Sequence, residues 1–138
     1  MEQRLLALLA GSHTGVLTTL KRDGRPQLSN VGYVFDPESR LIRISVTAGR
    51  AKTNNLVRDP RASFYTTAGD FRSYVVAEGV AELTPVAADP NDATVDELVE
   101  VYREIRGEHP DWDEYRAVMV SDARQVVRLP VDRVYGMA

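Results

Sequence analysis

The chain has 138 residues, 43% of them hydrophobic and 27% charged, which fits a single globular domain over 1–138 rather than a disordered or fibrous protein. It contains no cysteine, so disulfides and thiolate metal sites are excluded, and its formal net charge of -3 argues against a nucleic-acid-binding face. No segment approaches the ~20 consecutive apolar residues of a membrane-spanning helix, so we expect a cytoplasmic protein with no membrane or nucleic-acid partner.

The first third of the chain predicts one helix followed by three strands. A short amphipathic helix carries a cluster of leucines and stops at Gly11. A β-branched run, a turn around Asp23-Gly24 and a second extended run from Gln27 to Phe35 then predict a β-hairpin. The segment "LIRISV", residues 41–46, alternates polar and apolar side chains, which is typical of a half-buried strand.

The middle of the chain predicts a short helix and two strands. Residues 50–59, "RAKTNNLVRD", read as a helix of two to three turns that ends before Pro60, because proline disfavours helical geometry in the residue that precedes it. The segment "ASFYTT", residues 62–67, predicts a strand. A longer strand follows over 73–86, where Gly79 permits a bend.

The last third predicts two helices. Apolar side chains repeat at helical spacing between Val95 and Ile105, and Thr94 and Glu97 have the spacing of a capping box. A second helix is expected in "HPDWDEYRAVMVSD", where Asp111 and Glu114 again have the spacing of a cap. These two helices define a helical insertion at about 93–121.

The segment 125–138, "QVVRLPVDRVYGMA", predicts the final strand. Six strands with hairpin connections, one short helix between the third and fourth strands and a helical insertion before the last then suggest a small closed or split barrel. We therefore expect a mainly β, antiparallel protein with helical additions, built as a six-stranded split β-barrel.

Catalytic side chains are scarce in this sequence. His13 and His109 are the only histidines, and neither has a serine or an acid at a spacing that indicates a catalytic triad or a metal site. Acids of the expected helix such as Glu97 and Glu100 fit a solvated face. The sequence lacks a dinucleotide-binding glycine motif and a P-loop. No catalytic residue and no metal ligand is therefore assigned.

The start of the short helix is the best candidate site. A helix that begins near Arg50 directs unpaired backbone N–H groups toward the preceding loop, and Arg50 and Lys52 add positive charge to it. Such a site favours an anion such as phosphate. An ordinary solvated helix is the alternative, and Arg58 and Arg61 are expected to have structural roles.

The second hairpin strand adds polar groups to this region. Gln27, Ser29 and Val31 share one face of the strand, and Leu28, Asn30 and Gly32 share the other. Amide and hydroxyl groups on a barrel strand are suited to contacts with the edge of a heteroaromatic ring. A solvent-facing strand is the alternative interpretation.

Four segments carry a resemblance to a known family. They are "GVLTTLKRDGRPQLSNVGYVFD", "RISVTAGRAKTNNLVRDPRASF", "YVVAEGVAEL" and "VVRLPVDRVYG". The chain resembles, over nearly its whole length, the deazaflavin-dependent enzymes of the pyridoxamine-phosphate-oxidase-like split-barrel superfamily, the flavin/deazaflavin oxidoreductases of the B group. These enzymes typically use coenzyme F420. The R-A-K-T-x-N-L…D-P-R-A-S block is the most specific part of the match.

The resemblance implies a homodimer with two cofactor clefts at the subunit interface. Arg50 and Lys52 match the basic pair that would hold the cofactor phosphate, and Asn55 lies on the same helix face as Lys52. Lys21, Arg22 and Arg25 are candidates for contacts with the polyglutamate tail of the cofactor. The cofactor-binding residues that it implies are Gln27, Ser29, Asn30, Ser45, Val46, Thr47, Arg50, Ala51, Lys52 and Asn55.

The function that the resemblance implies is a reductase that transfers hydride from reduced F420 to a conjugated small molecule such as a quinone, a bilin or an enone. A cofactor that carries the reactive carbon needs few acid–base groups from the protein, which agrees with the scarcity of such residues here. Two alternatives remain open. One is an FMN-dependent oxidoreductase with the same fold, and the other is a non-catalytic protein that binds the cofactor or haem, with His13 or His109 as the haem ligand.

Overall fold

The computed structural model describes residues 1–138 as two antiparallel β-sheets with four helices. The helices are α1 (Glu2–Ala10), α2 (Ala51–Arg58), α3 (Ala93–Arg106) and α4 (Trp112–Ser121). The strands are β1 (Thr14–Leu20), β2 (Pro26–Gly32), β3 (Val34–Asp36), β4 (Leu41–Thr47), β5 (Arg61–Thr67), β6 (Tyr74–Val80), β7 (Glu82–Leu83), β8 (Arg124–Pro130) and β9 (Arg133–Met137). No helix is both long and apolar enough to span a membrane.

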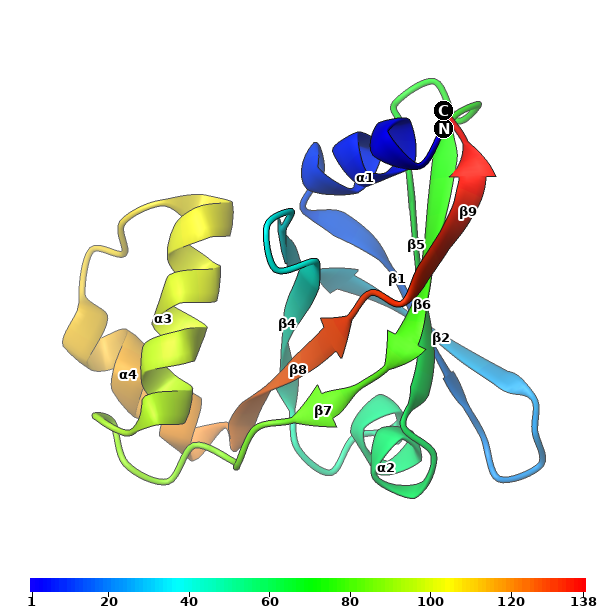
Figure 1. Cartoon of the computed structure of the whole chain (residues 1–138). Coiled ribbons are helices and arrows are strands. Elements are labelled where there is room, and N and C mark those ends of the chain that lie inside the picture. The colour runs from blue at the N-terminus through cyan, green and yellow to red at the C-terminus, as the bar shows by residue number, and fades with distance from the viewer.

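One sheet has five strands in the order β2-β1-β5-β6-β9, and the other has four in the order β3-β4-β8-β7. Figure 1 shows α1 over one end of the molecule, α2 at the opposite end and the α3–α4 hairpin beside β4 and β8. The two chain termini lie close together beside α1. The prediction of a mainly β, antiparallel fold with helical additions is confirmed.

The expected count of six strands is corrected to nine, because three of the six extended segments are divided between the two sheets. The chain passes from β2 to β3 at Tyr33, from β6 to β7 at Ala81, and from β8 to β9 at residues 131–132. At each of these corners it leaves one sheet and enters the other. The two sheets are separate hydrogen-bonded units and do not close, so the expected six-stranded split β-barrel is not confirmed.

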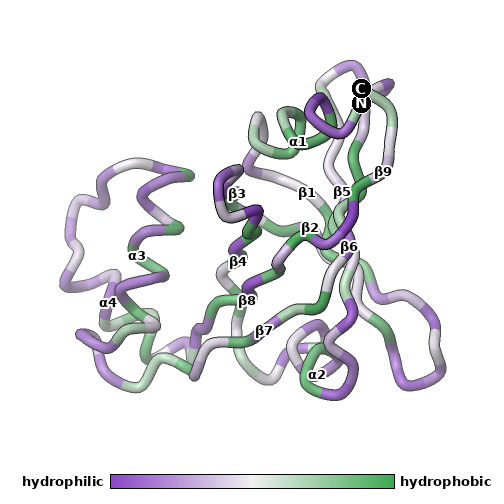
Figure 2. Tube along the Cα trace, in the orientation of Figure 1, coloured by the Kyte–Doolittle hydropathy of each residue, from purple (hydrophilic) through white to green (hydrophobic).

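The main hydrophobic core lies between the two sheets and α1. It includes Leu17, Ile42, Ile44 and Phe64, all of them fully buried. Figure 2 shows hydrophobic residues along α1 and the strands and hydrophilic residues at the tip of the β1–β2 hairpin. Tyr33 is also fully buried, donates a hydrogen bond from its hydroxyl to the backbone O of Leu9, and burial raises its pKa to about 12.

Gly79 has a different role from the predicted one. The segment bends at Ala81, and Gly79 lies within β6, paired with Ala62 of β5. A Cβ atom at Gly79 would lie 2.1 Å from the backbone O of Pro130, at the end of β8. Glycine is therefore required here because the two sheets approach each other closely at this corner.

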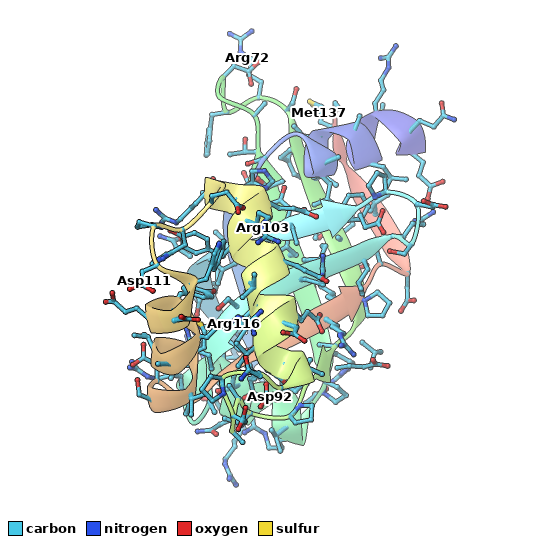
Figure 3. The ribbon with its side chains drawn as sticks, turned by 90° about the vertical axis from the view of Figure 1, so that its left-hand side faces the viewer. Arg72, Asp92, Arg103, Asp111, Arg116 and Met137 are labelled. Atoms are coloured by element: carbon cyan, nitrogen blue, oxygen red, sulfur yellow. The ribbon has the colours of Figure 1, made fainter.

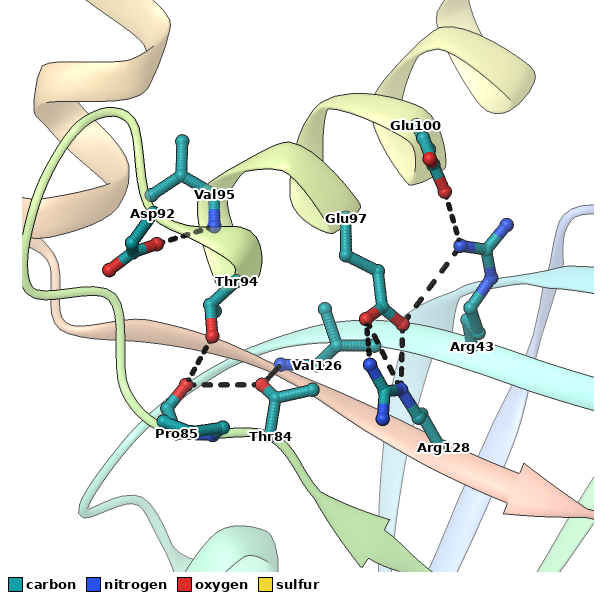
Figure 4. Close-up of polar contacts among 10 residues, drawn as sticks. All are labelled: Arg43, Thr84, Pro85, Asp92, Thr94, Val95, Glu97, Glu100, Val126 and Arg128. Atoms are coloured by element: carbon teal, nitrogen blue, oxygen red, sulfur yellow. Dashed lines mark hydrogen bonds and ion pairs between the residues drawn. The ribbon is translucent and has the colours of Figure 1, made fainter.

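The N-terminus of α3 is capped by Asp92 and not by the predicted pair. The Asp92 carboxylate accepts a hydrogen bond from the backbone N of Val95 (2.9 Å), whereas the hydroxyl of Thr94 donates to the backbone O of Pro85 (2.8 Å). Figure 4 shows both contacts. The predicted capping box is wrong, because both of its side chains have partners outside the helix.

Glu97 holds α3 against the four-stranded sheet. Arg43 and Arg128 occupy paired positions on β4 and β8, and the Glu97 carboxylate lies between them. Its oxygens accept from Nε of Arg128 at 3.0 and 3.2 Å and from Nη2 of the same guanidinium, and one oxygen lies 3.9 Å from Arg43. Glu100 pairs with Arg43 at 2.8 Å. The Glu97 side chain is only 11% exposed, so its predicted place on a solvated face is wrong.

Candidate functional site

The turn between β4 and α2 presents the predicted basic pair. Gly49 has a φ of 78°, a conformation that glycine adopts readily, and it allows the chain to reverse after Thr47. Arg50 is the N-cap residue of α2, and its backbone N donates to Oγ1 of Thr53 at 3.0 Å. The Thr53 hydroxyl also contacts the backbone O of Thr47 at 3.2 Å. These contacts fix the start of α2 beside the end of β4.

A third cation lies in this region. Arg124 is the first residue of β8 and pairs with Thr47 across the β4–β8 ladder. Its Nη1 donates to Oγ1 of Thr47 at 3.0 Å, while its Nε is buried without a hydrogen-bond partner. Burial lowers the pKa of Lys52, and the charges of Arg124 and Arg50 lower it further, so the three cations are electrostatically coupled.

None of these three cations forms a salt bridge with an acidic side chain. Three like charges without a counter-ion destabilise one another, and an anion bound among them would relieve this repulsion. The arrangement therefore has the chemistry of a phosphate or carboxylate site, and the anion-binding role of Arg50 and Lys52 stays a prediction.

A chain of hydrogen bonds links α2 to the β1–β2 hairpin. Nδ2 of Asn55 donates to the hydroxyl of Thr19 (3.1 Å), which donates to Oε1 of Gln27 (2.8 Å). Nε2 of Gln27 in turn donates to the hydroxyl of Ser29 (2.7 Å). At the other end, Arg58 donates to Oδ1 of Asn55 (3.1 Å) and to a backbone O of the hairpin (2.6 Å).

This series of hydrogen bonds brings together three of the predicted residues, Gln27, Ser29 and Asn55. The link between them is Thr19, which is fully buried. Because each donor in the chain has a defined acceptor, the orientations of the Gln27 and Asn55 amides are fixed. Arg58 has the structural role predicted for it, with Asn55 and the backbone O of Leu20 as its partners.

The remaining predicted residues lie in several places around this centre. Ser45 and Arg124 both line a pocket of about 300 Å³ between β4 and the α3–α4 hairpin. Asn30, on the opposite face of β2 from Ser29, lines a groove of about 580 Å³. Val46 is buried in the main core, so its side chain contacts other apolar residues and only its backbone faces the ladder with β8.

Ala51 is exposed at the start of α2 and lines a groove of about 700 Å³ between this helix and the β1–β2 turn. Lys21 and Arg22 line the same groove, whereas Arg25 is not among its lining residues. Two of the three hairpin cations predicted to meet a polyanionic tail therefore face α2 across one groove.

The two histidines are engaged with the backbone. Nδ1 of His13 donates to the backbone O of Tyr33 at 3.0 Å, and Nδ1 of His109 accepts from the backbone N of Asp111 at 2.9 Å. No group of three or more His, Asp or Glu side chains is placed to bind a metal ion.

Two residues of the site were not predicted from the sequence. Thr19 had a local signal, because a hairpin turn at Asp23-Gly24 places it opposite Gln27 once the register is fixed. Arg124 had no local signal, because its contact with Thr47 spans 77 residues and depends on the pairing of β4 with β8.

The fold and the site define an antiparallel two-sheet β-protein with a cluster of uncompensated cations where a central strand meets a short helix. Solved structures share this fold. A conserved hypothetical protein from Mycobacterium tuberculosis is 26% identical with a TM-score of 0.74, covering 99% of this chain and 84% of that one. An F420 reductase is 21% identical with a TM-score of 0.71, covering 94% of both chains.

The chain belongs to the pyridoxamine 5'-phosphate oxidase family, whose profile matches residues 1–138. Among characterised relatives, the F420H(2)-dependent biliverdin reductase of Mycobacterium tuberculosis (strain CDC 1551 / Oshkosh) is 29% identical over 133 residues. The aligned region covers 96% of this chain and 85% of the relative. The match therefore extends over nearly the whole chain.

Proposed function

We propose that the protein is a coenzyme F420-dependent oxidoreductase, a reductase that acts on a conjugated small molecule such as a quinone, a bilin or an enone. The observation that carries this proposal is the group of three cations, Arg50, Lys52 and Arg124, which no acidic side chain neutralises. It is supported by the similarity to the F420H(2)-dependent biliverdin reductase.

The residues present fit a phosphorylated deazaflavin. Arg50 supplies a planar guanidinium that can donate two hydrogen bonds to a phosphate, and Lys52 supplies a compact charge. When bound, the deazaflavin provides the hydride, and the protein provides orientation, anion binding and exclusion of water. In this proposal Ser45, Val46 and Thr47 run along the ring system, with Val46 contributing its backbone.

The polar chain described above has a positioning role in the proposed site. Gln27, Ser29 and Asn55 are held in fixed orientations through Thr19, so side-chain hydrogen bonds connect the strand that approaches the ring to the helix that binds the phosphate. Ala51 lines the same groove as Lys21 and Arg22. The positive charges of Lys21 and Arg22 suit the carboxylates of a polyglutamate tail.

We also propose that the protein acts as a homodimer of single-domain chains. The outer face of the five-stranded sheet carries exposed apolar side chains, among them Leu28 and Met137, each 62% exposed. The strand register places Tyr135 and Met137 of β9 on the face that Leu28 and Asn30 of β2 share. A second copy packed on this face would place Asn30 beside a cleft between the subunits.

The proposal is tested with purified protein, F420 and FMN. Fluorescence titration should show binding of F420, and mixing the protein with reduced F420 and a panel of quinones, bilins and enones should oxidise the cofactor in proportion to the acceptor added. A yellow protein that retains FMN and has no affinity for F420 would favour the FMN-dependent alternative. F420 binding without turnover of any acceptor would favour a non-catalytic binding protein.

A further inference from the structure

The pocket between the four-stranded sheet and the α3–α4 hairpin has an unusual distribution of charge. It has a volume of about 300 Å³ and is lined by Ser45, Ile105, Arg106, Tyr115 and Arg124, among others. No aspartate or glutamate lines it. In a chain of net charge -3, this is a local excess of positive charge.

Among the arginines on the elements around this pocket, only those that line it lack an acidic partner. Six arginines lie on β4, β8 and the two helices of the hairpin, and four of them pair with acids. The pairs are Arg43–Glu100, Arg103–Glu108, Arg116–Asp96 and Arg128–Glu97. Figure 3 shows Arg103 on α3 and Arg116 on α4, and Figure 4 shows Arg43 and Arg128. The two arginines without an acidic partner, Arg106 and Arg124, are the two that line the pocket.

The other walls are aromatic and apolar. The rings of Tyr102 and Tyr115 lie 4.9 Å apart at an interplanar angle of 56°, and the Tyr115 hydroxyl donates to the backbone O of Leu98 at 3.1 Å. Because its hydroxyl is hydrogen-bonded, the Tyr115 ring is held in place and offers apolar surface to a planar molecule. Met119 adds a polarizable side chain to the same wall.

The pocket opens toward a larger space. Gly32, Ile105 and Arg106 line both this pocket and the neighbouring groove of about 580 Å³ that contains Asn30. A volume of about 300 Å³ accommodates part of a ligand, and the adjoining groove can accommodate the rest. Arg124 connects the pocket to the cation cluster beside Thr47.

We propose that this pocket binds a carboxylate of the acceptor, with Arg106 and Arg124 as its cations and the tyrosine wall against the conjugated part of the molecule. The proposal rests on the proposed function in calling the ligand an acceptor. It narrows the substrate class to planar conjugated molecules that carry a carboxylate, such as a bilin dicarboxylate, and disfavours neutral quinones.

The test uses the intrinsic fluorescence of Trp112, the sole tryptophan, whose ring lies 5.5 Å from that of Tyr115. A bilin dicarboxylate and its dimethyl ester are titrated separately into cofactor-free wild type, Arg106→Gln and Arg72→Gln. Arg72 is the matched control, because it lies in the β5–β6 turn, outside the pocket, and Figure 3 shows it projecting from the end of the molecule.

Arg106→Gln should weaken binding of the diacid about tenfold and change that of the ester less than twofold, because a charge-assisted hydrogen bond is lost only with the diacid. Arg72→Gln should change neither. Unaltered diacid binding, or equal losses for diacid and ester, would overturn the proposal.

A second titration distinguishes the acceptor from the other source of carboxylates, the cofactor tail. F420 with its glutamates and the same cofactor without them are titrated into wild type and Arg106→Gln. We expect Arg106→Gln to leave both affinities unchanged, and a loss for the tailed form alone would overturn the proposal by assigning the pocket to the cofactor. Diacid binding that depends on Arg106 in a protein that binds no F420 would support the pocket and contradict the proposed function.

Discussion

At the scale of single residues, the state of Lys52 is the clearest link between stability and ligand binding. Its ammonium is half-buried next to two guanidinium groups, and its pKa is lowered first by burial and then by Arg124 and Arg50. A lysine with a lowered pKa destabilises the folded protein at neutral pH, since the unfolded chain holds the same proton more tightly. A bound anion reverses this effect.

We therefore expect Lys52→Met to stabilise the ligand-free protein slightly and to weaken F420 binding by about ten- to a hundredfold. Thermal unfolding measures the first effect and fluorescence titration the second. Arg72→Met, which removes an exposed cation from the β5–β6 turn, serves as the control and should change neither. A Lys52→Met protein that binds F420 like the wild type would contradict the assignment of this residue.

The pH dependence of the same variant gives an independent check. At neutral pH Lys52 is charged in the unfolded chain, so the destabilising effect of its burial is present. As the pH rises from the lowered pKa of folded Lys52 toward the ordinary value of 10.5, the unfolded chain also loses the proton and the effect disappears. The difference in free energy of unfolding between Lys52→Met and wild type should shrink over this range. A difference that stays constant with pH would show that Lys52 is not perturbed.

At the scale of secondary-structure elements, the sequence predicted which segments are extended or helical but not where the strands divide. Alternation and β-branched runs are local properties, so all six extended segments were found. Tyr33 and Ala81, where segments change sheets, are not glycine or proline and gave no local indication of a corner, because a corner is set by contacts with the other sheet. The prediction of a capping box at the start of α3 was wrong for a related reason, because Glu97 pairs with Arg128, which is remote in sequence.

The close approach of the two sheets at Gly79 provides a test at this scale. Gly79→Ala should destabilise the protein by about 3 kcal/mol, because the new methyl group would meet the backbone O of Pro130 and force the two sheets apart. Gly69→Ala is the matched control, since a Cβ at that position meets nothing within 4 Å. Chemical denaturation of both variants measures the difference, and equal stabilities would contradict the close approach of the sheets.

At the scale of the whole molecule, the resemblance over the chain predicted the family, while composition and spacing predicted a mainly β protein with an anion site at Arg50 and Lys52. The alternation along the strand placed Asn30 and Ser29 on opposite faces, but it could not show which of these faces lies toward α2, and sequence reasoning did not find Arg124. Both depend on how the two sheets and the helical hairpin are arranged in space. The apolar outer face of the five-stranded sheet likewise emerges only from the strand order.

The proposed dimer makes a prediction for this face. Tyr135→Glu places a charge on the exposed apolar surface and should convert a wild-type dimer to a folded monomer with weakened F420 binding, as measured by light scattering and fluorescence titration. Val118→Glu, on α4 and outside this face, is the control and should remain dimeric. A wild-type protein that is monomeric at micromolar concentration would contradict the proposal.

The central claim is that uncompensated cations at the start of α2 hold the phosphate of a deazaflavin. The most direct measurement is the affinity of wild type and of the Arg50→Gln/Lys52→Gln double variant for F420 and for FMN, by fluorescence titration under identical conditions. We predict that wild type prefers F420 and that the double variant binds it at least about a hundredfold more weakly while remaining folded. Undiminished affinity in the double variant, or a wild-type preference for FMN, would contradict the account.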